Sequence, residues 1–106
     1  AITPSASSSK ILAFYSFTGY NNVNGCVHAT TLYRGSTNLS SETYGFAQHK
    51  TAGGGTEHFK QSVTYLDSPN TTNATTYKPY LKSSDGNTIG ISGDSDHTII
   101  LMEIAG

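Results

Sequence analysis

The sequence predicts an all-β domain, an antiparallel β-sandwich or jelly roll. Short apolar or alternating segments recur about every ten residues along the 106-residue chain, with Gly, Asn, Asp and Pro between them. That spacing is typical of the strands and turns of a sandwich. Thr and Tyr, which favour strands, are abundant, and the runs of helix-forming residues that long helices need are absent. The expected strands cover residues 10–18, 26–34, 43–47, 58–67, 75–83, 87–92 and 97–105.

The first third of the chain gives a linker and two strands. Residues 1–9 are rich in Ser and are expected to form a linker or lead-in segment before one β-sandwich domain, residues 10–106. Residues 10–18 are apolar on both faces, which indicates a buried strand. Residues 19–25 combine Gly and Asn and are expected to form a turn. Residues 26–34 contain β-branched and aromatic side chains and predict the next strand.

The middle of the chain gives a short strand at residues 43–47, a connection with three consecutive glycines, and two alternating segments. Residues 58–67 place Gln61 and Val63 on one face and polar side chains on the other, which is typical of a half-buried strand. Residues 75–83 also alternate. Pro79 lies inside this second segment and has no N–H group to donate, so the strand is expected at a sheet edge or at a bulge.

The end of the chain contains the most apolar segment. Asp85 and Gly86 form a strong signal for a tight turn before the strand at residues 87–92. Residues 97–105 are apolar on both faces. A strand of this kind is expected in the centre of its sheet, where both of its faces are covered.

Composition and charge argue against several classes of function. Only 12% of the residues are charged, the net charge is −1, and the six basic residues are scattered. Nucleic-acid binding needs clustered Lys and Arg, and an anionic membrane surface has the same requirement. No apolar run approaches the length that crosses a bilayer. We therefore expect neither nucleic acid nor membrane as a partner.

The chemistry-bearing residues predict no active site, cofactor or metal site. Cys26, the one cysteine, is expected to be a buried and inert strand residue. The four histidines lack the spacing of a zinc motif, and the segment from Asp94 to Asp96 lacks the Gly and Glu of a calcium loop. No nucleophile elbow or paired-carboxylate motif is present. The sequence thus predicts a protein that acts by binding, without catalytic residues.

Several segments, taken together and in order, resemble a known family. They are TPSASSSKIL, VTYLDSPNTTNATTYKPYLKSSDGNTIGI and HTIILMEI. This set is similar to the C-terminal domains of phage tail-fibre and other virion structural proteins, particularly those of marine phages and cyanophages. The family resembles the trimeric jelly rolls of the tumour-necrosis-factor and complement type. Pro79 departs from the pattern, because an ordinary strand residue is expected there.

The resemblance implies a homotrimer on the surface of a phage particle. As a fibre tip it would contact other virion proteins and a glycan or protein of the host surface. The alternative is a capsid decoration or head-fibre knob with a structural role. The short chain and its two doubly apolar strands also favour a homotrimer, because a lone subunit would have little core to spare.

Two groups of residues are the site candidates. Tyrosines in loops or on polar strand faces can stack on a sugar or a partner. The binding candidates are Tyr20, Asn21, Asn22 and Tyr80. The candidates for the core or the trimer interface are Tyr15, Phe17, Ile100 and Met102.

Overall fold

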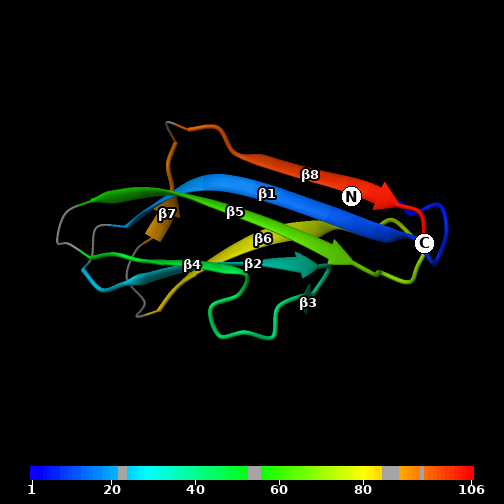
Figure 1. Ribbon diagram of the computed structural model, residues 1–106, viewed down its shortest axis with the longest axis horizontal. Helices are drawn as coiled ribbons and strands as arrows, with labels where there is room; N and C mark the ends of the chain where they lie inside the picture. Colours follow the sequence, from blue (N-terminus) through cyan, green and yellow to red (C-terminus); the bar gives the residue numbers. More distant parts are fainter. Residues whose placement is uncertain (22–23, 53–55, 85–88, 94) are drawn as a thin grey trace.

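The computed structural model contains two four-stranded antiparallel sheets that pack face to face, which confirms the predicted all-β sandwich (Figure 1). It describes residues 1–21, 24–52, 56–84, 89–93 and 95–106, and these contain no helix. The strands are β1 (Lys10–Asn21), β2 (Val27–Arg34), β3 (Thr37–Asn38), β4 (Ala47–Lys50), β5 (Glu57–Asp67), β6 (Tyr77–Ser83), β7 (Ile89–Ile91) and β8 (Thr98–Ile104).

The first sheet is built around β1. Strand β5 pairs with β1 along nearly its whole length. On the other side, β8 pairs with the first part of β1 and β7 with its last three residues. Long alternating or apolar segments make these ladders, as the sequence predicts. The sheet is therefore three strands wide at either end.

The second sheet is built in the same way around β2. Strand β6 pairs with one side of β2, and β4 and β3 share the other side. Among the described residues β6 pairs with β2 alone, so Pro79 lies in an edge strand, as predicted, opposite Leu32. The missing N–H group of a proline is tolerated at such an edge.

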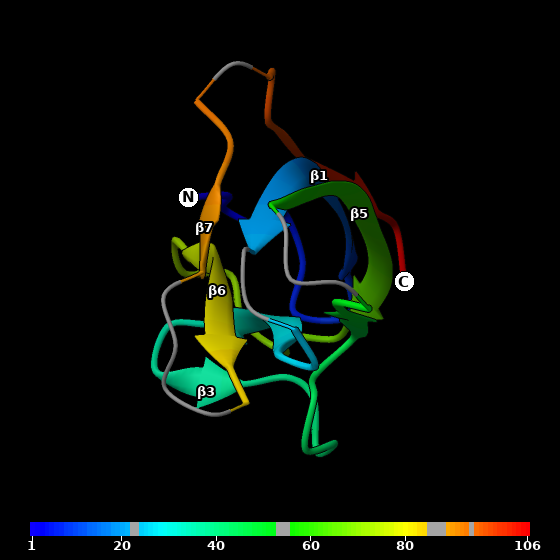
Figure 2. The ribbon, with the colours of Figure 1, turned by 90° about the vertical axis from the view of Figure 1, so that its left-hand side faces the viewer.

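The core lies between the two sheets. Ile11, Ala13, Tyr15 and Phe17 of β1 pack against Leu32, Val63 and Tyr77. The Tyr15 hydroxyl donates a hydrogen bond of 3.1 Å to Thr30 Oγ1, which in turn donates to the Tyr80 carbonyl at 3.0 Å. Seen end-on, the sheets approach each other at their edges, where β7 lies next to β6 (Figure 2). The result is an elongated body of 50 × 27 × 17 Å.

A buried ionic cluster joins the sheets at one end of the core. Arg34 Nη1 lies 2.7 and 2.8 Å from the two carboxylate oxygens of Asp67, and the Tyr77 hydroxyl donates to Asp67 Oδ2 at 2.6 Å. Burial, and then the hydrogen bond to Asp67, raise the pKa of Tyr77 above its usual value. Three strands from two sheets thus converge on one buried carboxylate.

The N-terminal segment packs against the sandwich. Ile2 exchanges two backbone hydrogen bonds with Thr75, and Pro4 is buried. The Ser5 amide and hydroxyl donate to Glu103 Oε1 at 2.7 and 2.6 Å. Hydrogen bonds from the Ser5 and Ser9 side chains and the Ser5 backbone lower the pKa of Glu103. Both chain ends therefore lie at the same end of the molecule (Figure 1).

The prediction that the last strand is central is wrong. Among the described residues β8 pairs only with β1, so it is an edge strand of the sheet. Apolar side chains on two faces indicate that both faces need cover. They do not by themselves place the strand between two neighbours.

Two further boundaries were predicted incorrectly. The short strand expected at residues 43–47 is mostly turn, with a single parallel bridge between Gly45 and Thr30, and β4 begins only at Ala47. The turn expected from residue 19 begins later, because β1 continues to Asn21. The Asp85–Gly86 turn, the glycine run at 53–55 and Asp94 lie outside the described residues.

Candidate functional site

One surface cavity is shaped by the connection between β3 and β4. The Phe46 amide donates to the Thr30 carbonyl at 2.9 Å, and the Gly45 amide donates to the Glu42 carbonyl at 3.2 Å. Gly45 has a φ of 68°, and a Cβ atom there would lie 2.3 Å from the Thr30 oxygen. Only glycine allows this close approach in the left-handed region. Gly45 therefore fixes the connection against β2.

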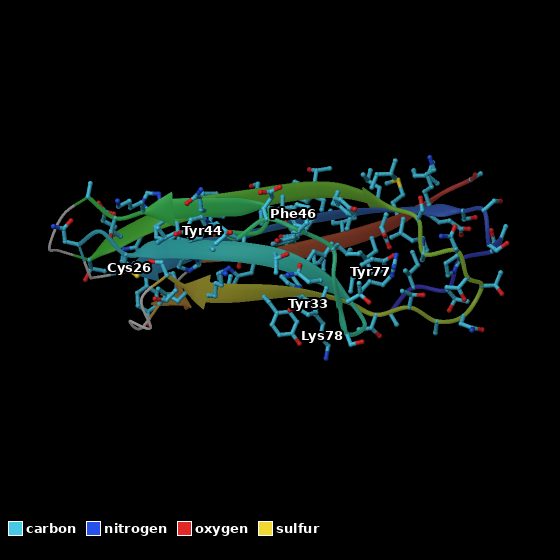
Figure 3. The ribbon with its side chains drawn as sticks, turned by 90° about the horizontal axis from the view of Figure 1, so that it is seen from below. Cys26, Tyr33, Tyr44, Phe46, Tyr77 and Lys78 are labelled. Carbon is cyan, nitrogen blue, oxygen red and sulfur yellow. The ribbon has the colours of Figure 1, made fainter. Side chains whose placement is uncertain are left out.

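Two tyrosines form the aromatic wall of the cavity. Tyr33 of β2 and Tyr80 of β6 point outward, and their ring centroids lie 4.5 Å apart with an interplanar angle of 50°. Tyr80 is 47% exposed in an edge strand. Lys78 is the cross-strand partner of Tyr33, and Figure 3 shows the two beside each other at the surface. The register of the β2–β6 pair thus builds an exposed aromatic platform.

The third tyrosine of the cavity comes from the connection that Gly45 fixes. Lys82 Nζ lies 5.9 Å from the centroid of the Tyr44 ring. This is within the range of a cation–π interaction. Because Lys82 is the cross-strand partner of Ala29, Tyr44 and Lys82 lie over the small side chain of Ala29.

Polar side chains complete the cavity. Thr31 Oγ1 donates to Asn38 Oδ1 at 2.6 Å, and the Ser40 amide donates to the same oxygen at 3.1 Å. These bonds fix the Asn38 amide, whose nitrogen has no partner among the residues that the structure describes. Glu42 also lines the cavity. The volume of the cavity is about 260 Å³.

A different kind of surface lies on the outer face of the first sheet, where β8 pairs with β1. Two rows of cross-strand neighbours run over β5, β1 and β8. We call the residues of these two rows, which are given at the end of this paragraph, together with Ile104, the apolar face. Leu66, Ile100 and Met102 are 48, 50 and 53% exposed, and Ile104 is exposed as well. The rows are Leu66–Leu12–Met102 and Thr64–Phe14–Ile100.

Apolar exposure continues around β8 to its inner side. Ile99 is exposed and lines a notch of about 170 Å³ between the edges of the two sheets, with Ile91 and Pro79. The second edge of β8 has no strand partner among the described residues. One short strand therefore presents two apolar sides and an open edge.

The four predicted binding residues are not brought together. Tyr80 lies in the cavity, but Tyr20 and Asn21 lie in β1 of the other sheet. Asn21 is fully buried, and the half-buried Tyr20 ring packs near His58 and Gly90. Their placement in an exposed loop was wrong, because strand pairing with β5 overrides the turn preference of Asn. Asn22 lies outside the described residues.

The predicted core or interface residues divide into two pairs. Tyr15 and Phe17 are buried in the core, while Ile100 and Met102 lie on the apolar face. Sequence reasoning missed Tyr33, Tyr44 and Asn38, which are distant from Tyr80 in the chain. The strand register, which places Thr31 opposite Tyr80, and the connection that Gly45 fixes bring them together.

Cys26 and His28 are two further buried residues that can titrate. Cys26 is buried, as predicted. His28 is buried, and its Nε2 donates to the Gly90 carbonyl at 3.2 Å. Burial lowers the pKa of His28. Within the described part of the chain, no three His, Cys, Asp or Glu side chains gather in a way that could hold a metal ion.

Comparison of the chain with protein-family models, curated proteins and solved structures finds no match. The described residues also contain no helix that is long and apolar enough to cross a membrane. The two surfaces are therefore interpreted from their own chemistry.

Proposed function

We propose that this chain is a phage virion domain of jelly-roll type that assembles as a homotrimer and binds the host cell surface without catalysing a reaction. Two four-stranded sheets, with the chain crossing between them, support the jelly-roll assignment. Segments such as TPSASSSKIL and HTIILMEI support the virion assignment through their resemblance to fibre C-terminal domains. The proposed location is the surface of the particle.

The exposure of β8 carries the proposal of assembly. Its outward residues Ile100 and Met102 belong to the apolar face, and its inward Ile99 is exposed beside the notch. Monomeric proteins seldom expose a contiguous apolar surface of this kind, and an open strand edge is a template for another chain. A closed ring of identical subunits covers both without open polymerisation. A homotrimer is the closed ring that the resemblance implies.

The cavity lined by Tyr33, Tyr44 and Tyr80, which we call the tyrosine cavity, favours host attachment over the alternative, a capsid decoration or head-fibre knob. Both functions need a stable assembly, so the apolar face serves either. A decoration protein has no need of a concave site with three tyrosines on the opposite side of the subunit. A fibre tip uses such a site for contact with its receptor, because exposed tyrosines are effective binding residues.

The assembly is tested by the mass of the native particle in dilute solution. We expect three times the 11.2 kDa of one chain, and a monomer after Ile100→Asp. Tyr80→Asp is the matched control, because it changes a side chain of similar exposure on an edge strand of the other sheet and should leave the mass unchanged. A folded wild-type protein with the mass of one chain would overturn the proposed homotrimer.

A further inference from the structure

The tyrosine cavity approaches the size of a site for a small ligand. Its volume of about 260 Å³ lies just below the roughly 300–1,000 Å³ that is usual for sites of drug-sized ligands. The floor is the outer face of β2, with Ala29 and Thr31, and the walls come from β6 and from the connection that Gly45 fixes. The site is therefore largely formed before any ligand binds.

The walls combine flat apolar rings with hydroxyl and amide groups. Tyr33 and Tyr80 present two rings at 4.5 Å between centroids, and Tyr44 closes the other side beside Lys82. Each tyrosine offers an apolar face and one hydroxyl group. A pyranose sugar has the complementary chemistry, because its ring carries a face of C–H groups and a rim of hydroxyl groups.

Polar groups are placed where such a rim would be held. The Asn38 amide is fixed through its oxygen by Thr31 and Ser40, which leaves its nitrogen as a donor. Glu42 supplies a carboxylate acceptor, and its side chain has no partner among the described residues. A fixed donor and an acceptor beside stacking rings can orient a hydroxylated ring, which a purely apolar pocket cannot do.

Charge argues for a neutral ligand. The lining contains one cation, Lys82, which lies near the Tyr44 ring, and one anion, Glu42. A phosphate or sulfate group is usually bound by Arg or by several basic side chains, and no arginine lines this cavity. The lining therefore has no excess of either charge.

We propose that the cavity formed by Tyr33, Tyr44, Tyr80 and Asn38 binds a neutral pyranose sugar, through ring stacking and hydrogen bonds to its hydroxyl groups. This inference rests on the proposed host attachment, since a cell-surface glycan is the form in which the virion meets such a sugar. One sugar per subunit should bind weakly. Three copies on one particle raise the effective affinity through multivalency.

The test uses NMR titration of the full chain with three probes. These are methyl α-D-glucopyranoside, methyl β-D-galactopyranoside and N-acetyl-D-glucosamine, with glucose 6-phosphate as a charged comparison. We expect at least one neutral sugar to shift the amide signals of Tyr33, Asn38 and Tyr80. If none of the three shifts them, or if only the phosphorylated sugar does, the proposal is overturned.

Matched variants separate the cavity from the rest of the molecule. Tyr80→Ser should weaken sugar binding at least tenfold, while Tyr80→Phe, which keeps the ring, should stay within threefold. Asn38→Ala should also weaken it and provides a second, exposed variant if the first is poorly folded. Tyr20→Phe, on the other sheet, should have no effect. Unchanged affinity in both Tyr80→Ser and Asn38→Ala would overturn the proposal.

The test of the sugar site can be distinguished from the test of the homotrimer. Leu66→Ser on the apolar face should change the mass of the particle and leave the Kd for a single sugar unchanged. If the wild-type chain is a monomer that still binds the sugar, the homotrimer fails and the sugar site stands. If the chain is a trimer that binds no neutral sugar, the sugar site fails and the assembly stands.

Discussion

The outer faces of the two sheets differ, although both sheets are built in the same way. Each sheet has one long central strand, one full-length neighbour and two short strands on the other side. Around β8 the first sheet turns leucine, isoleucine and methionine side chains outward, although the rest of β5 turns out His58, Lys60, Ser62 and Thr64. The second sheet turns tyrosines, threonines and lysines outward. Alternation alone determines which side chains leave the core. The chemistry of the outward positions then determines whether a face fits a flat partner or a small ligand.

The cluster of Arg34, Asp67 and Tyr77 joins the two sheets. Its loss should have the largest effect, because both outer faces depend on the packing of the sheets. Asp67→Ala removes the partner of Arg34 and the acceptor of the buried Tyr77 hydroxyl. Breaking a buried ion pair commonly costs 3–5 kcal/mol, and because Arg34 is partly exposed we expect about 3 kcal/mol. Urea unfolding measures the loss.

Asp67→Asn is the control for this cluster. It keeps the size of the side chain and one acceptor, so it should cost less than Asp67→Ala. Assembly and sugar binding should weaken together in Asp67→Ala, since both surfaces rest on one core. A loss below about 1 kcal/mol would mean that the cluster does not hold the sheets together.

Gly45→Ala should affect only the outer face of the second sheet, where the tyrosine cavity lies. The new Cβ atom would lie 2.3 Å from the Thr30 oxygen, and the left-handed backbone there adds strain, so we expect a cost of about 2 kcal/mol. The connection must move away from β2, so sugar affinity should fall at least tenfold while the mass of the particle stays the same. Unfolding and titration of one sample measure both effects.

Gly35→Ala is a control with the same type of backbone. Gly35 has a φ of 57°, but a Cβ atom there meets nothing within 4 Å. It should lose some stability through strain and keep its sugar affinity. Equal loss of affinity in both variants would show that general destabilisation, and not the position of the connection, controls the cavity.

The role of the apolar face in assembly is tested by the dependence of stability on protein concentration. An assembling chain gains apparent stability as its concentration rises, whereas a monomer does not. Leu66→Ser should reduce that gain by about 1–2 kcal/mol, because a buried leucine contributes about this much. In a monomer the half-exposed Leu66 would contribute only a few tenths of a kcal/mol. Thermal unfolding at several concentrations distinguishes the two cases.

The sequence predicted the regular parts of this comparison well. The alternation of residues 58–67 correctly places Gln61 and Val63 inside, and Pro79 correctly marks β6 as an edge. These features are local, because strand period and the missing N–H group of proline act within a few residues. The positions of the long strands along the chain followed from local patterns of the same kind.

Features that depend on distant residues were missed. Gly45 lies in the middle of the segment expected to form a strand, but it makes only a single bridge to Thr30 of β2, where a Cβ atom would not fit. The cavity needs a register between β2 and β6 that nothing in either segment specifies. The apolar pattern of β8 predicted a central strand, but β8 lies at the edge of its sheet with Ile99, Ile100 and Met102 exposed. In each case the deciding contact lies far away in the sequence.

The smallest expected effect is a dependence on pH that acts on both faces at once. His28 is buried between the sheets, its Nε2 donates to Gly90, and its Nδ1 has no partner among the described residues. Burial lowers the pKa of His28 in the folded state, with a smaller contribution from nearby His49. Between that lowered pKa and the value of about 6.5 in the unfolded chain, the unfolded state binds more protons. The free energy of unfolding should therefore be constant above about pH 7 and should decrease below it, by at most about 1.4 kcal/mol per pH unit for one proton.

Urea unfolding at pH 8, 7, 6 and 5 measures this slope. His28→Gln, which keeps an N–H donor for Gly90, should flatten the slope over this range. If the variant keeps the full wild-type slope, the acid sensitivity comes from other groups, and His28 is not the residue that couples both faces to pH.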